Sequence, residues 1–448
     1  MLTANEIFET LRGKIRTGEL PPGEILPPVR EMAEQLKVNR NTVASAYKKL
    51  VAAGVVVTQG RNGTTVRKHE SFPEQEGASK NGVLKDVSSG NPEPTVLPAV
   101  STLTPGIRTR PRNYGEPVIN QELVAYAQRW FSQDISGPFR VNLTHGAVDA
   151  IERLVSGYLS SGEKVVVEDP CFLSSINMIR SLGYVPVGVP VDHEGLLPAS
   201  LLVALREGAQ VVIITPRAHN PTGCSLTPAR AAEIKTVLAD YPHVMVIIDD
   251  HFSHLSGVDF HPVLPAETQH WAVIRSVSKF LGPDLRMAFV ASNAETAHRI
   301  ELRLTSGMNW VSHIIQDMAA RALLSPDINQ KFKQASRYYT RRREWFRTEL
   351  SHQGIDTVRP CDGLNIWLPL SKPAGDVAMQ MKARGWLVRT GEAYSLGHEP
   401  NALRLTLSGL EKHEVISLAQ DLAQVLKETG NRITGAGDDH VTCHHGFF

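Results

Sequence analysis

Cysteine is scarce in this sequence of 448 residues. The four cysteines lie far apart, and no two of them form a CxxC pair. A scaffold held together by disulfides needs many cysteines in a short chain, so that class of protein is excluded. The scarcity fits a reducing compartment, and we expect a cytoplasmic protein.

Long apolar runs are also absent. No stretch reaches the roughly 18 apolar residues that a bilayer-spanning helix needs. The opening MLTANEIFETL carries acidic residues, whereas a secretory signal would carry bases followed by an apolar run. We therefore expect no membrane partner.

A strong charge of either sign is missing from the chain as a whole, because its formal net charge is only +1. The charge is uneven, however. Residues 1–68 hold 11 Lys and Arg against 6 Asp and Glu, a balance of +5, and the remaining residues hold 36 against 40, a balance of −4. A basic segment on a near-neutral body is typical of a nucleic-acid-binding head on an enzyme-sized domain.

Capping and turn signals divide the basic segment into short elements. Thr3 with Glu6 makes a capping box, Pro28 suits a helix start, and Asn39 is a good N-cap. Apolar and β-branched runs on either side of a GRNG turn predict two strands. Two helices joined by a tight turn and followed by a hairpin make a winged helix-turn-helix, which is a DNA-binding fold. The predicted elements are helices over 3–18, 29–36 and 40–53 and strands over 55–59 and 64–66.

The second helix of such a pair enters the major groove, where its first residues meet base edges. Arginine can bind guanine, and asparagine can bind adenine, through paired hydrogen bonds. The candidate base-reading residues are Asn39, Arg40, Asn41 and Thr42. The candidate backbone contacts are Arg30, Lys48 and Lys49 on the helices and Gly60, Arg61 and Asn62 at the wing tip.

The run LPPGEILPPVREMAEQLKVNRNTVASAYKKLVAAGVV resembles the GntR family of bacterial regulators, and the resemblance covers about residues 4–67. The wing departs from the subfamily's usual G-x-G-T, because Arg61 in RNGT replaces the first glycine. The alternative interpretation is a small protein-interaction domain whose arginines are solvated surface charges. The resemblance implies DNA contacts from Arg30, Asn39, Arg40, Thr42 and the wing near Gly60.

Beyond the head the composition changes. Residues 69–94 are mostly polar and have no period, which predicts a flexible linker. Apolar strands such as KVVVED, QVVIITP and VMVIID then alternate with helical stretches, the pattern of a mainly parallel sheet covered by helices on both faces. The predicted divisions are a head over 1–68, a linker over 69–94, an α/β domain over 95–430 whose small α+β part spans 330–430, and a disordered tail over 431–448.

Lys279 is the candidate catalytic residue of the α/β domain. It directly follows the predicted strand WAVIRSVS, at the sheet edge where the ligand sites of α/β proteins lie. A lysine amine there can hold the aldehyde of pyridoxal 5′-phosphate (PLP) as a Schiff base. Ser276 and Ser278 flank it with hydroxyls, and Arg286 can pair with a phosphate.

The other parts that a PLP site needs occur elsewhere in the domain. Asp249, or the less favoured Asp250, ends a strand and can keep the pyridine nitrogen protonated. Asn220 in HNPTG can donate to the cofactor's 3′-oxygen, and Phe172 in EDPCF can cover the ring. The phosphate needs backbone amides at a helix start, and the candidates are Gly146, Ala147 and Val148.

Each of these residues has an ordinary structural explanation when taken alone. Together they resemble the fold-type I, aspartate aminotransferase-like PLP enzymes in motif, order and approximate spacing, over about residues 85–430. The resemblance implies that Arg404 in LRLTLSG binds a substrate α-carboxylate. It also implies that Tyr114 in NYGEP reaches the PLP phosphate of the other subunit.

The sequence departs from that family just after the acid pair, where DDHF stands and a tyrosine is usual. Either His251 takes the place of the tyrosine beside the 3′-oxygen or that contact is lost, and both alternatives would alter the pKa of the Schiff base. An imidazole that titrates near neutrality would make the Schiff base respond to pH in the physiological range. We therefore expect slow or absent transamination.

A GntR-type head joined to an aminotransferase-like body resembles the MocR/GabR regulators, and is most similar to their branch linked to vitamin B6 metabolism. The resemblance implies a PLP-dependent transcription regulator and a domain-swapped homodimer. It implies a double-stranded DNA operator with two half-sites, and an effector (an amine, an amino acid or PLP itself) that acts at Lys279. Two alternatives are a working aminotransferase with an incidental DNA-binding extension and a repressor whose body is a PLP-free dimerisation platform.

No metal site is expected. The acidic, histidine and cysteine side chains of the tail match no known spacing of metal ligands, and disorder explains them better. The residues concerned are Asp438, Asp439, His440, Cys443 and His444.

Overall fold

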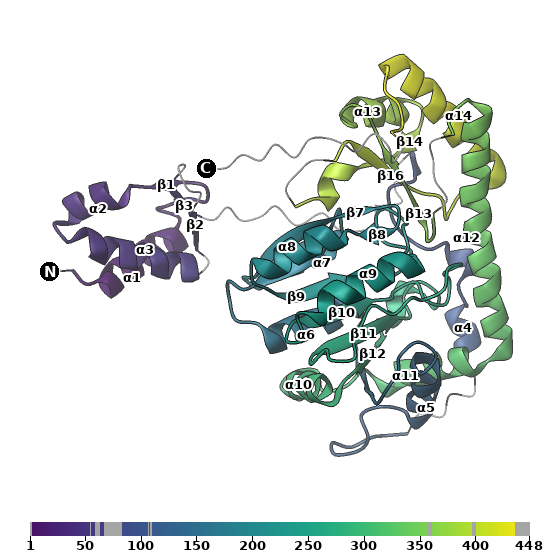
Figure 1. The fold of residues 1–448 in the computed structure, drawn as a ribbon, viewed down its shortest axis with the longest axis horizontal. Helices are drawn as coiled ribbons and strands as arrows, with labels where there is room; N and C mark the ends of the chain where they lie inside the picture. The colour runs from purple at the N-terminus through teal and green to yellow at the C-terminus, as the bar shows by residue number, and fades with distance from the viewer. Residues whose placement is uncertain are drawn as a thin grey trace. The chain divides into compact units, whose positions relative to one another are not determined.

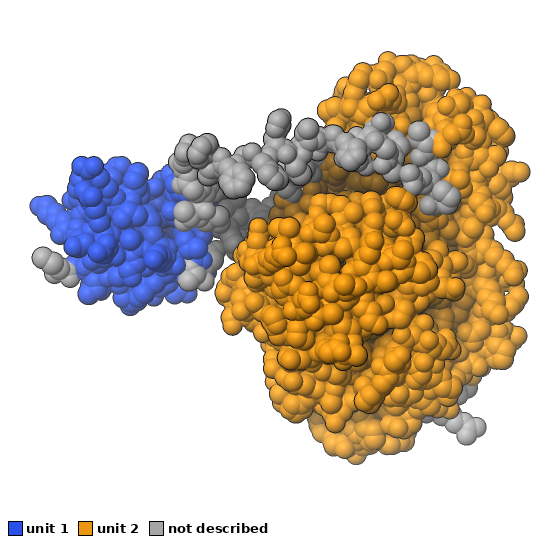
Figure 2. All heavy atoms as spheres, viewed as in Figure 1, with its two compact units in different colours: residues 1–74 blue, residues 75–448 orange. Residues whose placement is uncertain are grey.

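The computed structural model describes residues 2–53, 55–58, 63–66, 83–105, 107, 110–356, 361–396 and 400–434. They fall into two compact units, residues 1–74 and 75–448, which we call the head and the body and which Figure 2 shows in blue and orange. The boundary predicted after residue 68 lies outside the described residues. Among the described residues, no helix is both long and apolar enough to cross a membrane.

The head is the winged helix-turn-helix that the sequence predicts. Thr3 and Glu6 form the capping box of the first helix, and Ile7 and Leu50 lie in one buried cluster between the helices and the sheet. The Pro-Gly segment between the first two helices contains a two-residue strand, in which Ile25 pairs with Thr65. The elements are α1 (Ala4–Thr17), β1 (Ile25–Leu26), α2 (Val29–Leu36), α3 (Arg40–Ala52), β2 (Val56–Thr58) and β3 (Thr64–Val66), with sheet order β1-β3-β2.

An eight-stranded sheet forms the centre of the body, in the order β5-β12-β11-β10-β9-β6-β7-β8 (Figure 1). Strands β11, β10, β9, β6 and β7 are parallel neighbours, whereas β12 runs antiparallel to β11 and β5. The strands are β5 (Arg140–Thr144), β6 (Lys164–Asp169), β7 (Val185–Asp192), β8 (Gly195–Leu196), β9 (Ala209–Ile214), β10 (Met245–Asp249), β11 (Trp271–Ser276) and β12 (Ala288–Ser292).

The near-continuous apolar strands are explained by burial on both faces of this sheet. Along β9 successive residues alternate between two cores: Val211 and Ile213 belong to one, and Val212 and Ile214 to the other. The mainly parallel, helix-covered sheet predicted from the sequence is confirmed. The helices of this part are α4 (Val100–Leu103), α5 (Gln121–Phe131), α6 (Ala147–Tyr158), α7 (Leu173–Ser181), α8 (Pro198–Arg206), α9 (Pro228–Ala239), α10 (Ala294–Thr305) and α11 (His313–Leu324), with 3₁₀ turns at Pro94–Val96 and Pro283–Leu285.

A smaller α+β subdomain follows the long helix α12 (Figure 1). Its core is separate from the two cores of the large sheet and is lined by α12, α13, α14 and the strands β13 and β16. The elements are α12 (Pro326–His352), β13 (Asn365–Pro369), α13 (Gly375–Ala383), β14 (Trp386–Leu387), β15 (Arg389–Thr390), a 3₁₀ turn (Gly391–Tyr394), β16 (Ala402–Thr406) and α14 (Lys412–Thr429).

Two predicted boundaries are wrong where the structure describes them. Strand β4 (Lys85–Asp86), inside the predicted linker, pairs in parallel with β14 of the small subdomain. At the other end, Ile433 bridges to Leu370 and is buried, although the tail was expected to begin at residue 431. Both segments are ordered by contacts with residues distant in sequence, which local composition does not reveal.

Candidate functional site

The carboxyl ends of neighbouring strands bring the predicted PLP residues together. Lys279 follows β11, and Asp249 ends β10, the strand beside it, where it pairs in register with Ile274. The Lys279 ammonium donates a hydrogen bond to the carbonyl oxygen of Gly90 at 3.1 Å. Gly90 lies in the segment predicted to be a linker, so sequence reasoning missed it as part of the site.

A cradle for an anion lies at the start of α6. Gly146 precedes the helix with φ at 101°, and no side chain caps the helix end. The Arg286 guanidinium lies directly over this turn, because it donates to the carbonyl oxygen of His145 at 3.2 Å. A Cβ on Gly146 would come within 2.7 Å of Arg286 Nη2, so only glycine allows this approach. Amides at a helix N-terminus together with a guanidinium suit a phosphate dianion.

The serines beside Lys279 face each other. Ser276 Oγ donates to Ser278 Oγ at 3.0 Å and accepts from the Ser278 amide at 3.2 Å. Ser276 is buried, and both hydroxyls lie within the turn that carries Lys279. The pair therefore fixes the backbone that positions the lysine, and a direct contact with the cofactor stays a prediction.

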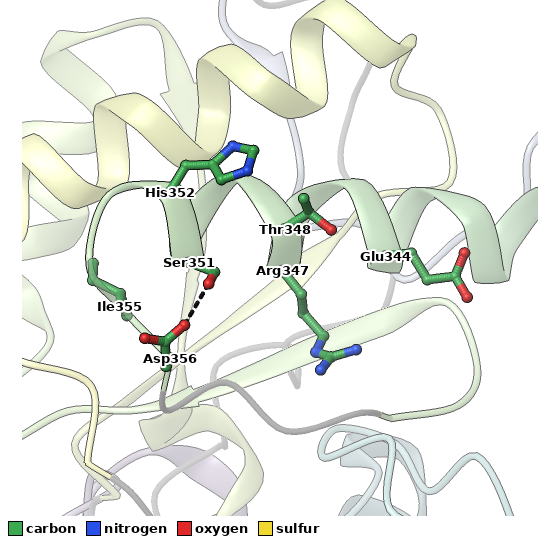
Figure 3. A pocket seen from close by; sticks show the side chains of 7 residues that line it. All are labelled: Glu344, Arg347, Thr348, Ser351, His352, Ile355 and Asp356. Carbon is green, nitrogen blue, oxygen red and sulfur yellow. Dashed lines mark hydrogen bonds between the residues drawn. The ribbon is translucent and has the colours of Figure 1, made fainter.

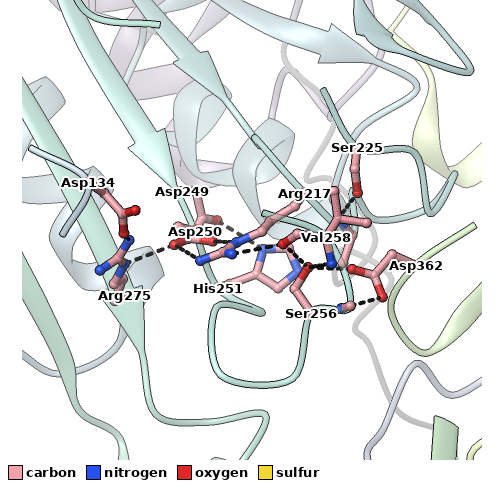
Figure 4. Close-up of polar contacts among 12 residues, drawn as sticks. Asp134, Arg217, Ser225, Asp249, Asp250, His251, Ser256, Val258, Arg275 and Asp362 are labelled. Atoms are coloured by element: carbon pink, nitrogen blue, oxygen red, sulfur yellow. Dashed lines mark hydrogen bonds and ion pairs between the residues drawn. The ribbon is translucent and has the colours of Figure 1, made fainter. Parts of the chain in front are cut away.

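Two adjacent aspartates have different surroundings, which Figure 4 shows. Asp250 is completely buried and accepts hydrogen bonds from Arg217 at 2.7 and 2.8 Å and from Arg275 at 2.9 Å. Asp249 Oδ1 is also buried but has no hydrogen-bond partner. Burial, together with the carboxylates of Asp250 and Glu168, raises the pKa of Asp249 to about 7. Asp249 is therefore the aspartate available to a ligand, as the sequence favoured.

An acceptor without a partner, buried at the end of β10, is what a protonated pyridine nitrogen would satisfy. The helix start under Arg286 would accept a phosphate, and Lys279 supplies the amine. These residues fit PLP. Phe172, which was expected to cover the ring, is half-buried and is the N-cap residue of α7.

Asn220 and Arg404 form a linked pair across the two parts of the body. The side-chain oxygen of Asn220 accepts hydrogen bonds from Arg404 Nη1 and from Asn365 Nδ2, each at 3.2 Å. This orientation makes Nδ2 the end of Asn220 that can donate to a cofactor oxygen. Arg404 is fully buried in β16 and also donates to the carbonyl oxygen of Ser88.

His251 lies beside the predicted acid, with its Nδ1 3.9 Å from Asp249 Oδ2. Burial and the nearby Lys279 ammonium lower the pKa of His251 to about 4. The imidazole is thus neutral at physiological pH, and the expectation that it titrates near neutrality is wrong. The next residue, Phe252, is buried in the core against Tyr339 and cannot take the place of the missing tyrosine.

A buried ion pair that the sequence did not predict adjoins the site. His219 Nε2 lies 3.3 Å from Glu168 Oε2, and Glu168 also accepts hydrogen bonds from the Thr215 amide. Burial alone would lower the pKa of His219, but Glu168 outweighs it and raises that pKa to about 10. Charged residue types near strand ends were the available signal, since Glu168 begins EDP and His219 precedes Asn220.

Tyr114 lies away from these groups on the surface of the body. Its side chain is 87% exposed, and its ring meets the edge of Trp310 at 5.5 Å between centroids. Its predicted contact with a cofactor phosphate in the other subunit stays a prediction.

The recognition helix of the head presents its first residues to solvent. Arg40 and Asn41 are exposed, Thr42 is half-buried, and Lys48 is exposed further along α3. Asn39 accepts a hydrogen bond from the Asn41 amide at 2.9 Å, so its oxygen caps the helix, and only its amide nitrogen can donate to DNA. Arg30 lies 3.3 Å from Glu34, and Lys49 donates to Asn5. Gly60, Arg61 and Asn62 lie outside the described residues.

A polar cavity of about 280 Å³ lies at the end of α12, apart from the residues above (Figure 3). It is lined by the last turns of α12 and the loop that follows, and Ser351 donates a hydrogen bond to Asp356 across it. Its lining includes none of the predicted site residues.

Comparison with known proteins matches both units. The family model "Aminotransferase class I and II" matches residues 85–422, and "Bacterial regulatory proteins, gntR family" matches residues 3–66. The vitamin B6 salvage pathway transcriptional repressor PtsJ of Salmonella typhimurium is 47% identical over 424 residues, 95% of this chain and 98% of that protein. The HTH-type transcriptional regulator YdfD of Bacillus subtilis is 25% identical over 95% of this chain and 97% of its own.

Solved structures match the body. A kynurenine aminotransferase of Pyrococcus horikoshii superposes with a TM-score of 0.70 at 20% identity, over 78% of this chain and 92% of that one. At this identity the match establishes the fold alone, and that fold is the aminotransferase fold predicted from the PLP motifs.

Proposed function

Since the chain belongs to the aminotransferase class I and II family and carries a gntR-family head, as MocR/GabR regulators do, we propose that it is a PLP-dependent transcription regulator. The observation that carries the proposal is the unpartnered, buried Asp249 Oδ1 beside Lys279. A protein that used this body only for dimerisation would have no reason to leave a buried acceptor unsatisfied.

Different residues would hold different parts of the cofactor. Lys279 would bind it covalently, Asp249 would accept from its pyridine nitrogen, and Asn220 would donate to its 3′-oxygen. The α6 amides and Arg286 would hold the phosphate. The bound cofactor would supply an aldehyde carbon that reacts with amines.

The effector would act by favouring one arrangement of the protein over another. Arg404 would bind its carboxylate and Lys279 would be displaced by its amine, or PLP itself would act as the effector by binding to the site. A coupling of about 1–3 kcal/mol, or roughly 5–150-fold in DNA affinity, suffices for a useful switch. The relative PtsJ, which is named a vitamin B6 salvage repressor, favours target genes in vitamin B6 metabolism and a repressor role.

The proposed assembly is a homodimer with exchanged heads, bound to two half-sites of double-stranded DNA. Tyr114 would then reach the cofactor phosphate of the partner subunit. A twofold dimer presents two recognition helices, so the operator should have twofold symmetry.

The test is DNA binding by the full-length protein, with operator sequences selected from a random pool. Fluorescence anisotropy should give different affinities for PLP-loaded and PLP-free protein, and amino acids should alter the affinity of the loaded form. Lys279→Ala should remove the absorbance of covalently bound cofactor and the response to amino acids. Equal DNA affinity in all states would contradict the proposal.

A working aminotransferase is the alternative, because the body has the complete aminotransferase fold. We propose little turnover, since His251 occupies the place of a phenol donor. Turnover of about 1 per second or more with common amino acids and 2-oxo acids would make the enzyme the better description.

A further inference from the structure

Two charged side chains are buried together at the carboxyl edge of the large sheet. Glu168 and His219 are 3% and 1% exposed, and His219 Nε2 lies 3.3 Å from Glu168 Oε2. Taking two charges out of water can cost more free energy than their contact returns, and apolar residues of similar size often stabilise a fold as well. Stability alone therefore does not account for this pair.

The hydrogen bonds around His219 require protons on both of its ring nitrogens. The Thr222 hydroxyl donates to Cys224 Sγ at 3.0 Å, so its oxygen can only accept from His219 Nδ1, which lies 2.7 Å away. Nε2 faces the Glu168 carboxylate, which also can only accept. The side chain is therefore an imidazolium, in agreement with its pKa of about 10.

His219 is fixed within the turn that carries Asn220. Its amide donates to the carbonyl oxygen of Cys224 at 2.9 Å, and its ring is held by Thr222 on one side and Glu168 on the other. Asn220 follows directly in the chain. The end of β6 therefore anchors the turn from which Asn220 would reach the cofactor.

The carboxylate of the pair also acts on Asp249. One strand, β9, separates β6 from β10, so Glu168 and Asp249 lie at the same edge of the sheet, about 10 Å apart. Burial raises the pKa of Asp249, and the carboxylates of Asp250 and Glu168 raise it further. The Lys279 ammonium lowers that pKa, and the neighbouring His251 is neutral.

We propose that Glu168 and His219 are positioning residues of the cofactor site. The pair holds the turn of Asn220, and its charges form a dipole whose negative end acts on Asp249. That end favours a proton on the group that Asp249 binds, while the imidazolium limits the effect. The inference rests on the proposed function, because it concerns the site that would hold PLP.

Absorbance titration of the full-length, PLP-loaded protein tests the charges without DNA. His219→Gln leaves the Glu168 carboxylate without its counter-charge. The pH midpoint of cofactor absorbance should then rise by roughly one pH unit, the effect of a unit charge about 10 Å away at an effective dielectric constant of about 20. Glu168→Gln removes the negative end and should lower the midpoint. The double variant should match Glu168→Gln, because a buried imidazole without a carboxylate loses its proton.

Arg230→Gln is the matched control. It also leaves a carboxylate without its counter-charge, because Arg230 pairs with Asp192 at 2.8 Å at the end of β7. That strand lies one position further from β10 than β6 does, and Asp192 is partly exposed to the screening solvent. The midpoint should equal that of the unaltered protein, and melting temperatures show that each variant is folded.

A second measurement does not depend on the folding of His219→Gln. Glu168→Gln should weaken PLP binding roughly tenfold in the otherwise unaltered protein, and less than threefold in an Asn220→Ala background, because a positioning residue acts mainly through the residue that it positions. Fluorescence titrations with PLP on the four proteins of this cycle give the comparison.

Midpoints that move in the same direction in His219→Gln and Glu168→Gln, or in neither, would overturn the inference. So would an equal loss of PLP affinity with and without Asn220. A chain that binds no PLP would overturn the proposed function as well. Midpoints that shift as expected, without any effect of PLP on DNA affinity, would contradict only the proposed regulatory function.

Discussion

At the scale of single residues, the environment decides which of two neighbouring aspartates serves the ligand. Arg217 and Arg275 neutralise Asp250, and Arg275 pairs in turn with Asp134 (Figure 4). The Arg275 guanidinium also lies over the faces of Trp130 and Phe131. This network leaves Asp249 with the unsatisfied oxygen. The sequence favoured Asp249 over Asp250 as the ligand's partner. It could not show that two arginines bind Asp250 and leave Asp249 available.

The matched variants Asp249→Asn and Asp250→Asn should fail in different ways. Asp250→Asn removes the carboxylate charge that compensates the two buried guanidiniums, and it should lower the unfolding free energy by roughly 3 kcal/mol. Asp249→Asn should weaken PLP binding yet leave the PLP-free protein folded. Thermal melts and cofactor titrations on both variants measure this, and a similar loss of stability in both would contradict the division of roles.

The pH dependence of the Asp249 variant follows from its pKa of about 7. The unfolded carboxyl ionises near 3.8, so the folded PLP-free protein loses stability as the pH rises from about 4 to 7. Asp249→Asn removes that loss. Its melting temperature should therefore exceed that of the unaltered PLP-free protein at pH 8, and the difference should shrink toward pH 4.

His251 should affect the bound cofactor as a neutral group. Because its pKa is about 4, His251→Gln should leave the pH midpoint of cofactor absorbance between pH 6 and 8 unchanged. His251→Tyr adds a phenol donor beside the 3′-oxygen and should shift that midpoint. Absorbance titrations decide this, and a midpoint moved equally by both variants would show that the imidazole itself titrates.

At the scale of helices and strands, local signals predicted elements whose hydrogen bonds are local. The capping box of α1, the N-cap of α3 and the apolar strands of the large sheet were all foreseen. β4 was not, because it has two residues and its partner strand lies about 300 residues later. Glu168 and His219 were missed for the same reason, since only the fold brings them to 3.3 Å.

The exposed start of α3 makes a prediction about DNA. Arg40→Ala should cost about 1–3 kcal/mol in operator affinity and relax specificity at one base. Lys48→Ala, the control on the same helix, should weaken binding to every sequence and reduce the salt dependence. Anisotropy titrations at several salt concentrations compare them, and an Arg40→Ala variant indistinguishable from the unaltered protein would exclude Arg40 from the interface.

At the scale of the whole molecule, a neutral histidine joins distant parts of the body. His254 stacks on Trp130 of α5 at 4.2 Å and on Phe332 of α12 at 5.5 Å, and it shares a 2.7 Å hydrogen bond with Tyr126. Burial and the Arg275 guanidinium lower the pKa of His254 to about 3. The His254 imidazole therefore binds a proton less readily in the folded protein than in the unfolded chain.

Acid should unfold the protein partly through this residue. The unfolded imidazole titrates near 6.5, so stability is complete above that pH and is lost as the pH falls toward 3. His254→Phe should flatten the loss of melting temperature between pH 6.5 and 4.5, while costing about 1 kcal/mol at pH 7.5 for the lost hydrogen bond. An unchanged slope would mean that other groups govern acid unfolding.

The short strand β4 is the first strand after those of the head, within the described residues, and it pairs with the small subdomain. Lys85 is held by Glu414 at 2.6 Å, and three and five residues later Ser88 and Gly90 accept hydrogen bonds from Arg404 and Lys279. The segment that follows β4 is therefore held by the same side chains that would hold cofactor and effector. A ligand that drew Lys279 and Arg404 toward itself would break their hydrogen bonds to Gly90 and Ser88, so occupancy of the site would change how firmly residues 88–90 are held.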